Sequence, residues 1–212
     1  DLLGGEQSGF INEIGFETYQ KILNEAIEEL KENEFKDLYE EEVKSKGYTK
    51  EVQLDADLEL LFPDTYINNI SERLHLYTQL NNVENDEALA KYVLELKDRF
   101  GDLPPRARDL VSSIRLKWVA RSLGLEKLVL KKGKMLGYFI ADQESPFYQS
   151  DMFTQVINYV QKHSNECRIK EKETRKGLRL ILSYDSINTI DQALSSLRKL
   201  AGMTEDEPIL SS

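Results

Sequence analysis

Three charged side chains with helical spacing are the strongest candidate functional residues of this chain, and they are candidates for binding a partner. Glu95, Asp98 and Arg99 stand at positions i, i+3 and i+4, so one helix face would carry all three. Two interpretations fit the spacing. One is a surface ion pair between Glu95 and Arg99, worth ~0.3–0.5 kcal/mol. The other is a charged contact surface for a partner, which gives specificity and fast association yet releases readily.

A second charged set predicts a different kind of binding. A helix that begins near Pro104 would carry a possible basic face made of Arg108, Arg115, Lys117 and Arg121. Arg108 and Arg115 share a face because they are seven positions apart, while the other two lie partly round the helix. A basic helix of this kind is the alternative function, a contact with DNA. Pairing of these side chains with nearby acidic residues is the simpler explanation.

No spacing in the chain predicts catalysis or nucleotide binding. The pattern Gly-x-x-x-x-Gly-Lys-Ser/Thr is missing, and the lysines and glycines at 132–134 and 175–177 have neither its spacing nor the hydroxyl that would reach Mg²⁺. Neither Gly-x-Ser-x-Gly nor His-Glu-x-x-His occurs. The sequence thus predicts no catalytic residue and no bound cofactor, and an enzyme built on paired carboxylates is the remaining rival.

Cysteine and histidine usage argues against a disulfide or a zinc site. Cys167 is the only cysteine, and the two histidines are His75 and His163, far apart in the sequence. A single cysteine excludes an intrachain disulfide, and a zinc site would lack its usual paired thiolates. We therefore expect no metal ligands in this chain.

Length and composition predict a cytoplasmic protein with no membrane partner. The 212 residues, 40% apolar and 31% charged, suffice for one good core, or for a domain with a segment of its neighbour. No run reaches the ~18–20 apolar residues of a membrane helix, and the first residues lack a signal-peptide pattern. The formal net charge of −10 opposes non-specific binding of the whole chain to nucleic acid.

The first half of the chain predicts helices around one strand. Residues 17–30 follow the 3.6-residue period and form an apolar stripe that needs a partner surface. Residues 31–50 are strongly charged and predict a linker or a solvated helix. Alternation from Val52 to Leu58 predicts a half-buried strand, so a new domain begins near residue 50. Helices follow near 70–80 and 86–100.

The second half predicts an α+β arrangement. A longer helix begins near Pro105, because the first turn tolerates proline. Two hairpins turn at Lys132-Gly133 and Lys176-Gly177, with a helix near 153–160 between them and a last helix near 190–200. The order β-β-α-β-β-α predicts an α+β fold whose small mixed or antiparallel sheet is covered by helices.

Three blocks of the sequence resemble one protein family. The first is Leu2-Leu3-Gly4-x-x-Gln7-Ser8-Gly9 with Ile14-Gly15-Phe16 and Tyr19, the second is Phe62-Pro63-x-x-Tyr66-Ile67 with Arg73-Leu74-x-x-Tyr77, and the third is Glu95-Leu96-x-Asp98-Arg99-Phe100-Gly101-x-Leu103-Pro104. Together they resemble the C-terminal part of the bacterial transcription-repair coupling factor, a superfamily 2 translocase driven by ATP. The resemblance implies a tail of the helicase motor domain and a linker at 1–50, a C-terminal regulatory domain at 51–205 and a flexible tail at 206–212.

The resemblance also implies an autoinhibitory role. Glu95, Asp98 and Arg99 would hold the N-terminal repair-factor-binding domain of the same polypeptide and mask its site for the excision-repair damage-recognition ATPase. Gln7 would be a remnant of the motif that couples ATP hydrolysis to movement along duplex DNA. The parent protein would use ATP and Mg²⁺ to displace stalled RNA polymerase and would recruit nucleotide excision repair, whereas this fragment would act by binding alone.

Overall fold

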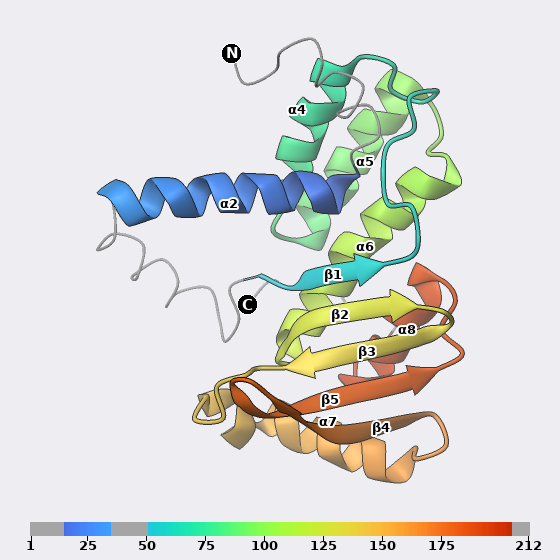
Figure 1. The fold of residues 1–212 in the computed structure, drawn as a ribbon. Coiled ribbons are helices and arrows are strands. Elements are labelled where there is room, and N and C mark those ends of the chain that lie inside the picture. Colours follow the sequence, from blue (N-terminus) through green and yellow to red (C-terminus); the bar gives the residue numbers. More distant parts are fainter. Residues whose placement is uncertain (1–14, 35–50, 205–212) are drawn as a thin grey trace. The chain divides into compact units, whose positions relative to one another are not determined.

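The computed structural model describes residues 15–34 and 51–204, except for the side chains of residues 27–34. The chain divides into two compact units, which are drawn together in Figure 1. The described part of the first, here called the helical unit, is residues 15–34 and 59–111. That of the second, the sheet unit, is residues 51–58 and 112–204. Each unit is described by itself.

The helical unit consists of α2 (Phe16–Glu34), α4 (Ile70–Asn81), α5 (Asp86–Phe100) and the first part of α6 (Pro105–Ser122). Asparagine caps begin α4 and α5: the Oδ1 of Asn69 accepts from the amide of Glu72 at 3.0 Å, and that of Asn85 from the amide of Ala88 at 2.8 Å. Such caps satisfy amides that have no partner within the helix.

Helix α2 packs on α4 through its first turns. The amide of Phe16 donates to the carbonyl of Leu60 at 3.2 Å. One turn later, the Nε2 of Gln20 donates to the Oδ1 of Asn81 at 2.6 Å. Further along the helix Ile22 is 49% exposed. The partner surface that the apolar stripe requires is therefore found, at the N-terminal end of α2, on a helix of the same chain.

Tyr77 lies at the centre of the aromatic core of the helical unit. The ring of Phe62 stacks on it with 5.2 Å between centroids, and the ring of Phe16 is tilted at 5.6 Å. The hydroxyl of Tyr77 accepts from the amide of Phe62 at 3.0 Å. Close by, the hydroxyl of Tyr92 donates to the carbonyl of Leu76 at 2.7 Å, so the buried hydroxyls also join elements.

The sheet unit contains a five-stranded mixed sheet in the order β1-β2-β3-β5-β4. Its strands are β1 (Gln53–Ala56), β2 (Leu125–Lys131), β3 (Lys134–Phe139), β4 (Cys167–Thr174) and β5 (Gly177–Asp185). Strand β1 is parallel to β2, and the other neighbours are antiparallel. Both predicted hairpins are present, and the first turns at Lys132 and Gly133, whose φ angles are both positive.

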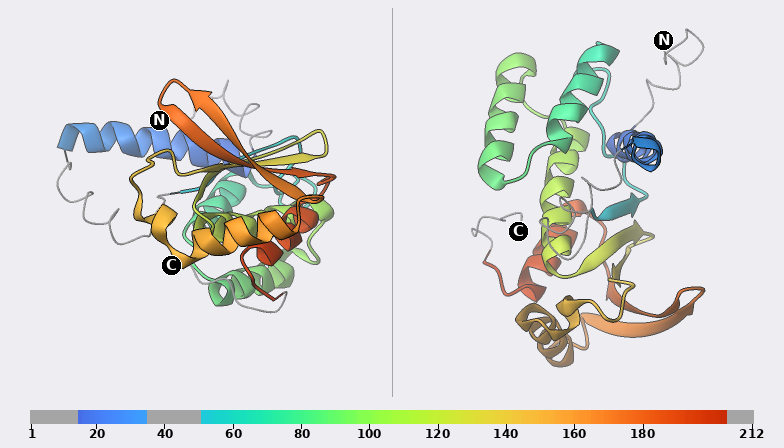
Figure 2. Two further views of the ribbon diagram at one scale, coloured as in Figure 1. Left: turned by 90° about the horizontal axis from the view of Figure 1, so that it is seen from below. Right: turned by 90° about the vertical axis from the view of Figure 1, so that its left-hand side faces the viewer.

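Among the described residues of the sheet unit, helices cover one face of the sheet, here called the covered face, and none covers the other, here called the open face (Figure 2). The covering helices are α7 (Asp151–Lys162), α8 (Ile190–Leu200) and the second part of α6. Alternate strand residues such as Leu128, Phe139 and Leu182 are buried, as are Val156 of α7 and Leu197 of α8. The α+β fold predicted from the order of elements is confirmed.

A short 3-10 helix, η1 (Pro146–Gln149), between β3 and α7 was not predicted. Its Phe147 is fully buried and packs against Phe139 and Phe153, with ring centroids 6.4 and 5.6 Å away. The N-cap Ser145 accepts from the amide of Phe147 at 3.3 Å. Four residues are too few to show a helical period in the sequence. The element is therefore recognised only in the structure, where the ring of Phe147 is buried.

Candidate interaction surface on α5

Helix α5 presents one buried and one exposed face. Leu89, Tyr92 and Leu96 are buried, and the helix ends at Gly101, whose amide donates to the carbonyl of Lys97 at 2.9 Å. Positions between those buried residues must therefore face solvent. This arrangement follows from the apolar period, which the sequence shows directly.

The exposed face carries two of the predicted site residues. Glu95 and Asp98 are exposed, and no ion pair involves either of them among the described residues. Leu94 beside them is 67% exposed, and it lies one turn from Asp98 on the same face. Leu94 was missed from the sequence, although a leucine that falls outside the apolar stripe of an amphipathic helix is a usable signal.

Arg99 has a different environment, which corrects the simpler of the two sequence interpretations. Its guanidinium forms an ion pair with Glu72 of α4 and not with Glu95. The guanidinium carbon lies 4.8 Å from the ring centroid of Phe100. Arg99 is thus held by two contacts while its side chain is still 50% exposed, so it both joins α4 to α5 and borders the exposed face.

The second and third of the sequence blocks that resemble the family contact each other beside the exposed face of α5. The hydroxyl of Tyr66 donates to the carbonyl of Gly101 at 2.8 Å, and its ring lies 5.8 Å from that of Phe100. Partial burial, and secondarily the charge of Asp102, raise the pKa of Tyr66, so the phenol stays protonated as a donor. The second block therefore fixes the end of the helix that carries the third.

The four basic residues of α6 that were predicted as a DNA contact do not form one exposed face. Arg108 is exposed, Arg115 and Arg121 are half-buried, and Lys117 is only 9% exposed. The predicted spacing is present, but Lys117 is buried. This burial removes one of the four cations that the alternative function, a DNA contact through α6, would require.

The other predicted residues contribute no site within the described part of the chain. Gln7 lies outside the described residues. Cys167 is buried, and burial raises the pKa of its thiol, which disfavours a reactive thiolate. Among the described residues there is no group of histidine, cysteine, aspartate and glutamate that could hold a metal ion. No described helix is long and apolar enough to cross a membrane.

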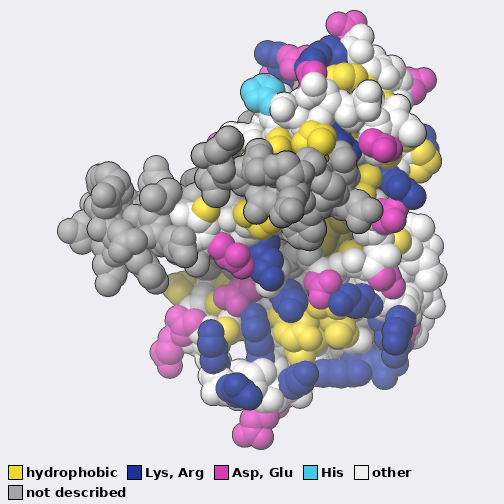
Figure 3. Space-filling model, turned by 45° about the horizontal axis from the view of Figure 1, so that its top comes forward, with side chains coloured by type: hydrophobic (Ala, Val, Ile, Leu, Met, Phe, Trp, Pro, Cys, Tyr) yellow, Lys and Arg dark blue, Asp and Glu magenta, His cyan; other side chains and the backbone are white. Residues whose placement is uncertain are grey.

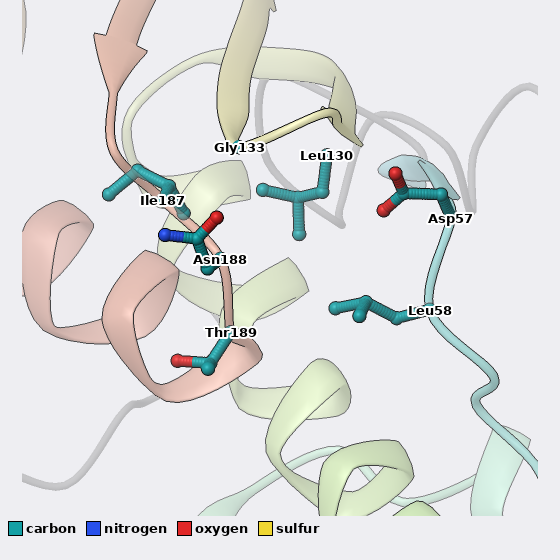
Figure 4. Close-up of a pocket in the computed structure, with 7 residues that line it drawn as sticks. All are labelled: Asp57, Leu58, Leu130, Gly133, Ile187, Asn188 and Thr189. Atoms are coloured by element: carbon teal, nitrogen blue, oxygen red, sulfur yellow. The ribbon is translucent and has the colours of Figure 1, made fainter.

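One cavity of about 270 Å³ opens in the sheet unit, between the end of β1, the first hairpin and the start of α8 (Figure 4). Its carboxylate, Asp57, accepts from the amide of Lys132 at 3.0 Å. Thr189 accepts from the amide of Gln192 at 3.0 Å as the N-cap of α8. These polar groups hold the hairpin and the start of α8 in place.

Comparison with known proteins identifies the fold. Residues 56–150 match the family model described as the TRCF domain, and this range includes α4, α5 and α6. The chain carries a TRCF domain. A solved structure described as the C-terminal domain of transcription-repair coupling factor has a TM-score of 0.52 and 20% identity, covering 74% of this chain and 96% of that chain. At that identity the match establishes the fold of the TRCF domain alone.

Curated relatives carry the same name. The transcription-repair-coupling factor of Rickettsia prowazekii (strain Madrid E) is 27% identical over 201 residues, which are 94% of this chain and 16% of that protein. That of Escherichia coli (strain K12) is 35% identical over 128 residues, or 60% of this chain and 11% of that protein. The chain, with its TRCF domain, is thus a relative of these factors that spans about a sixth of their length or less.

Proposed function

We propose that the TRCF domain is a regulatory, autoinhibitory module that binds a partner domain through the exposed face of α5. The observation that carries this proposal is the exposure of Leu94, Glu95 and Asp98 on one helix face, bordered by Arg99. An exposed leucine among charges supplies an apolar anchor, while the charges set the orientation and the encounter rate. This composition fits a contact that forms and releases.

The partner in this proposal is the N-terminal repair-factor-binding domain of the full-length protein. Tethering within one polypeptide raises the local concentration of the partner, so a weak contact can keep the resting state closed. The resemblance of the sequence blocks to the family implies that the full-length protein would be an ATP- and Mg²⁺-dependent translocase on duplex DNA. It would displace stalled RNA polymerase and recruit excision repair when the contact opens. The chain would contribute binding and no catalytic residue.

Calorimetric titration of this chain with the isolated N-terminal domain tests the proposal. The variant Glu95→Ala/Asp98→Ala/Arg99→Ala should abolish binding, and Leu94→Ala should weaken it about tenfold, the loss typical of an anchor residue. The matched control is Glu171→Ala/Glu173→Ala/Lys176→Ala in the second hairpin. It removes the same charges from exposed positions and should bind as the native chain does. Equal binding by the native chain and the first variant would refute the proposal.

Arg99 needs a separate control because it also pairs with Glu72. The variant Glu72→Gln leaves Arg99 in place but removes its ionic partner. If Arg99 acts as a contact residue, Glu72→Gln should bind normally while Arg99→Ala does not. Equal losses in both variants would assign Arg99 a structural role and leave Leu94, Glu95 and Asp98 as the contact. In the full-length protein, the triple variant should raise the ATPase rate.

A further inference from the structure

The described part of the sheet unit carries an excess of positive charge, although the chain as a whole is acidic. Residues 51–58 and 112–204 contain 16 lysines and arginines against 12 aspartates and glutamates, whereas residues 15–34 and 59–111 contain 8 against 16. The net charge of −10 therefore hides a positive excess in the described part of one unit. The proposed regulatory contact on α5 makes no use of this excess.

Strand register gathers part of the positive charge on the open face of the sheet. Lys127 pairs with Tyr138, Tyr138 with Ile181, and Ile181 with Lys170, so these four residues form one row across β2, β3, β5 and β4. Paired residues point to the same face, and this row alternates with the residues buried under the helices. Lys134 of β3 stands four positions from Tyr138, and Lys172 of β4 stands two positions from Lys170, so both share the face of the row.

Four of the lysines on this face are available to an anionic partner. The acids nearby are already paired: Asp55 with Lys131 at 3.0 Å, Asp185 with Arg168 at 3.6 Å and Glu126 with Arg179 at 2.6 Å. No ion pair within the described residues involves the other four, which are Lys127, Lys134, Lys170 and Lys172.

An aromatic ring lies among these cations. The Nζ of Lys127 is 5.8 Å and the guanidinium carbon of Arg179 is 5.4 Å from the ring centroid of Tyr138. The ring is half-buried, as are its neighbours Val129 and Leu136. Figure 3 shows a hydrophobic area over the sheet unit with lysines and arginines around it. An aromatic and apolar floor with a cationic border matches the surfaces on which unpaired bases stack.

We propose that the open face of the sheet binds single-stranded nucleic acid, with phosphates at the four available lysines and a base on Tyr138. Duplex DNA or an acidic peptide would engage the lysines but would leave the apolar floor unused, because neither presents an unstacked base. The cationic border and the Tyr138 ring together favour single-stranded nucleic acid. This surface is distinct from α5 and from the basic residues of α6.

Fluorescence anisotropy of this chain with labelled oligonucleotides tests the proposal. The probes are a 20-nucleotide oligo(dT), a 20-nucleotide oligo(U), a 20-base-pair duplex and a poly-glutamate peptide. Single strands should bind more tightly than the duplex, and the two single-stranded probes show whether DNA or RNA is preferred. The slope of log affinity against log salt should be about −3, since each of four phosphate contacts contributes about −0.7.

Matched variants separate the face from general charge. Lys127→Gln/Lys170→Gln should reduce the slope by about 1.4, which is two contacts. Lys162→Gln/Lys199→Gln removes two exposed charges from the C-terminal ends of α7 and α8 and should leave the slope unchanged. Tyr138→Leu, which keeps an apolar residue, should weaken single-strand binding roughly tenfold through lost stacking and should not affect the slope.

Three results would overturn the proposal. Tighter binding of the duplex than of the single strands would indicate phosphate contacts alone. Binding of poly-glutamate without binding of oligonucleotides would indicate an acidic protein partner. Failure of the folded chain, verified by circular dichroism, to bind any single strand at 50 mM salt or below would remove nucleic acid altogether.

Discussion

Arg99 shows how one side chain can serve two purposes in this protein. Its ion pair with Glu72 joins α4 to α5, and its position also borders the exposed face that carries Leu94, Glu95 and Asp98. The pair is half-exposed, so solvent screening limits its contribution to stability to about 0.2–1 kcal/mol. Loss of Arg99 should therefore affect binding more than folding, which is why Glu72→Gln is the informative control.

Two glycines with positive φ, Gly124 and Gly177, give a prediction for stability because only one of them is closely packed. Gly124 has φ +71°, and a Cβ there would lie 2.3 Å from a ring atom of Phe147. Gly177 also has positive φ, but a Cβ there would meet no atom within 4 Å. Gly177→Ala should thus lose about 1–2 kcal/mol through backbone strain alone. Gly124→Ala should lose more, because the buried ring cannot move away without opening the core.

Urea denaturation of the two glycine variants, followed by circular dichroism, checks this ranking. A larger fall in the midpoint for Gly124→Ala than for Gly177→Ala is expected, with unchanged slopes. Equal midpoints would mean that Phe147 and η1 adjust at little cost.

Helix α5 is the element that positions the proposed contact, and its ends are defined by local interactions. Its N-cap Asn85 and its C-terminal Gly101 are both visible in the sequence, and both are present in the structure. The apolar stripe then decides which face is exposed. At this scale the sequence predicts the helix well, whereas η1 was missed because so short an element has no period.

The N-cap of α5 allows a test at the scale of the element. Asn85→Ala should destabilise the helical unit by about 0.5–2 kcal/mol, since the amide of Ala88 loses its acceptor. Asn85→Asp should preserve stability, because a carboxylate also accepts that bond and favours the positive end of the helix dipole. Thermal unfolding measures both variants. An aspartate variant as unstable as the alanine variant would show that the cap is not the stabilising interaction.

Buried tyrosines couple the stability of the whole molecule to alkaline pH. Burial raises the pKa of Tyr77 and Tyr92 in the helical unit and of Tyr184 in the sheet unit, each from an ordinary value of 10.0. Below pH 10 these phenols are protonated in both the folded and unfolded states, so their stabilising effect is fully present. Above pH 10 the unfolded state loses protons first, and stability falls as pH rises.

An alkaline titration checks this prediction. The free energy of unfolding should be level up to about pH 9 and should decline above pH 10, with slope set by the tyrosines that stay protonated. The absorbance of tyrosinate at 295 nm should reach its full value, from all ten tyrosines, only when circular dichroism reports unfolding. Full ionisation with an intact circular dichroism spectrum would contradict it.

Besides its stability at alkaline pH, the whole molecule is characterised by an uneven distribution of charge along the chain. The acidic helical unit and the positive excess in the described sheet unit are averaged in the net charge of −10, which led to the expectation that nucleic acid would be repelled. Strand register, however, places four available lysines on the same face of the sheet as Tyr138. Because salt screens charges beyond about 10 Å, a bound strand would respond to this local group and not to the total.

Local properties of the chain were determined by the sequence itself. The types and order of helices and strands, the two hairpin turns, the asparagine caps and the exposed face of α5 all depend on residues within a few positions of one another, and periodicity records them. The pairing of Arg99 with Glu72, the burial of Lys117 and the placement of four lysines on the same face of the sheet as Tyr138 were decided only by the tertiary structure. These depend on which distant segments pack together and in what register, and a pattern read along the chain contains no such distances.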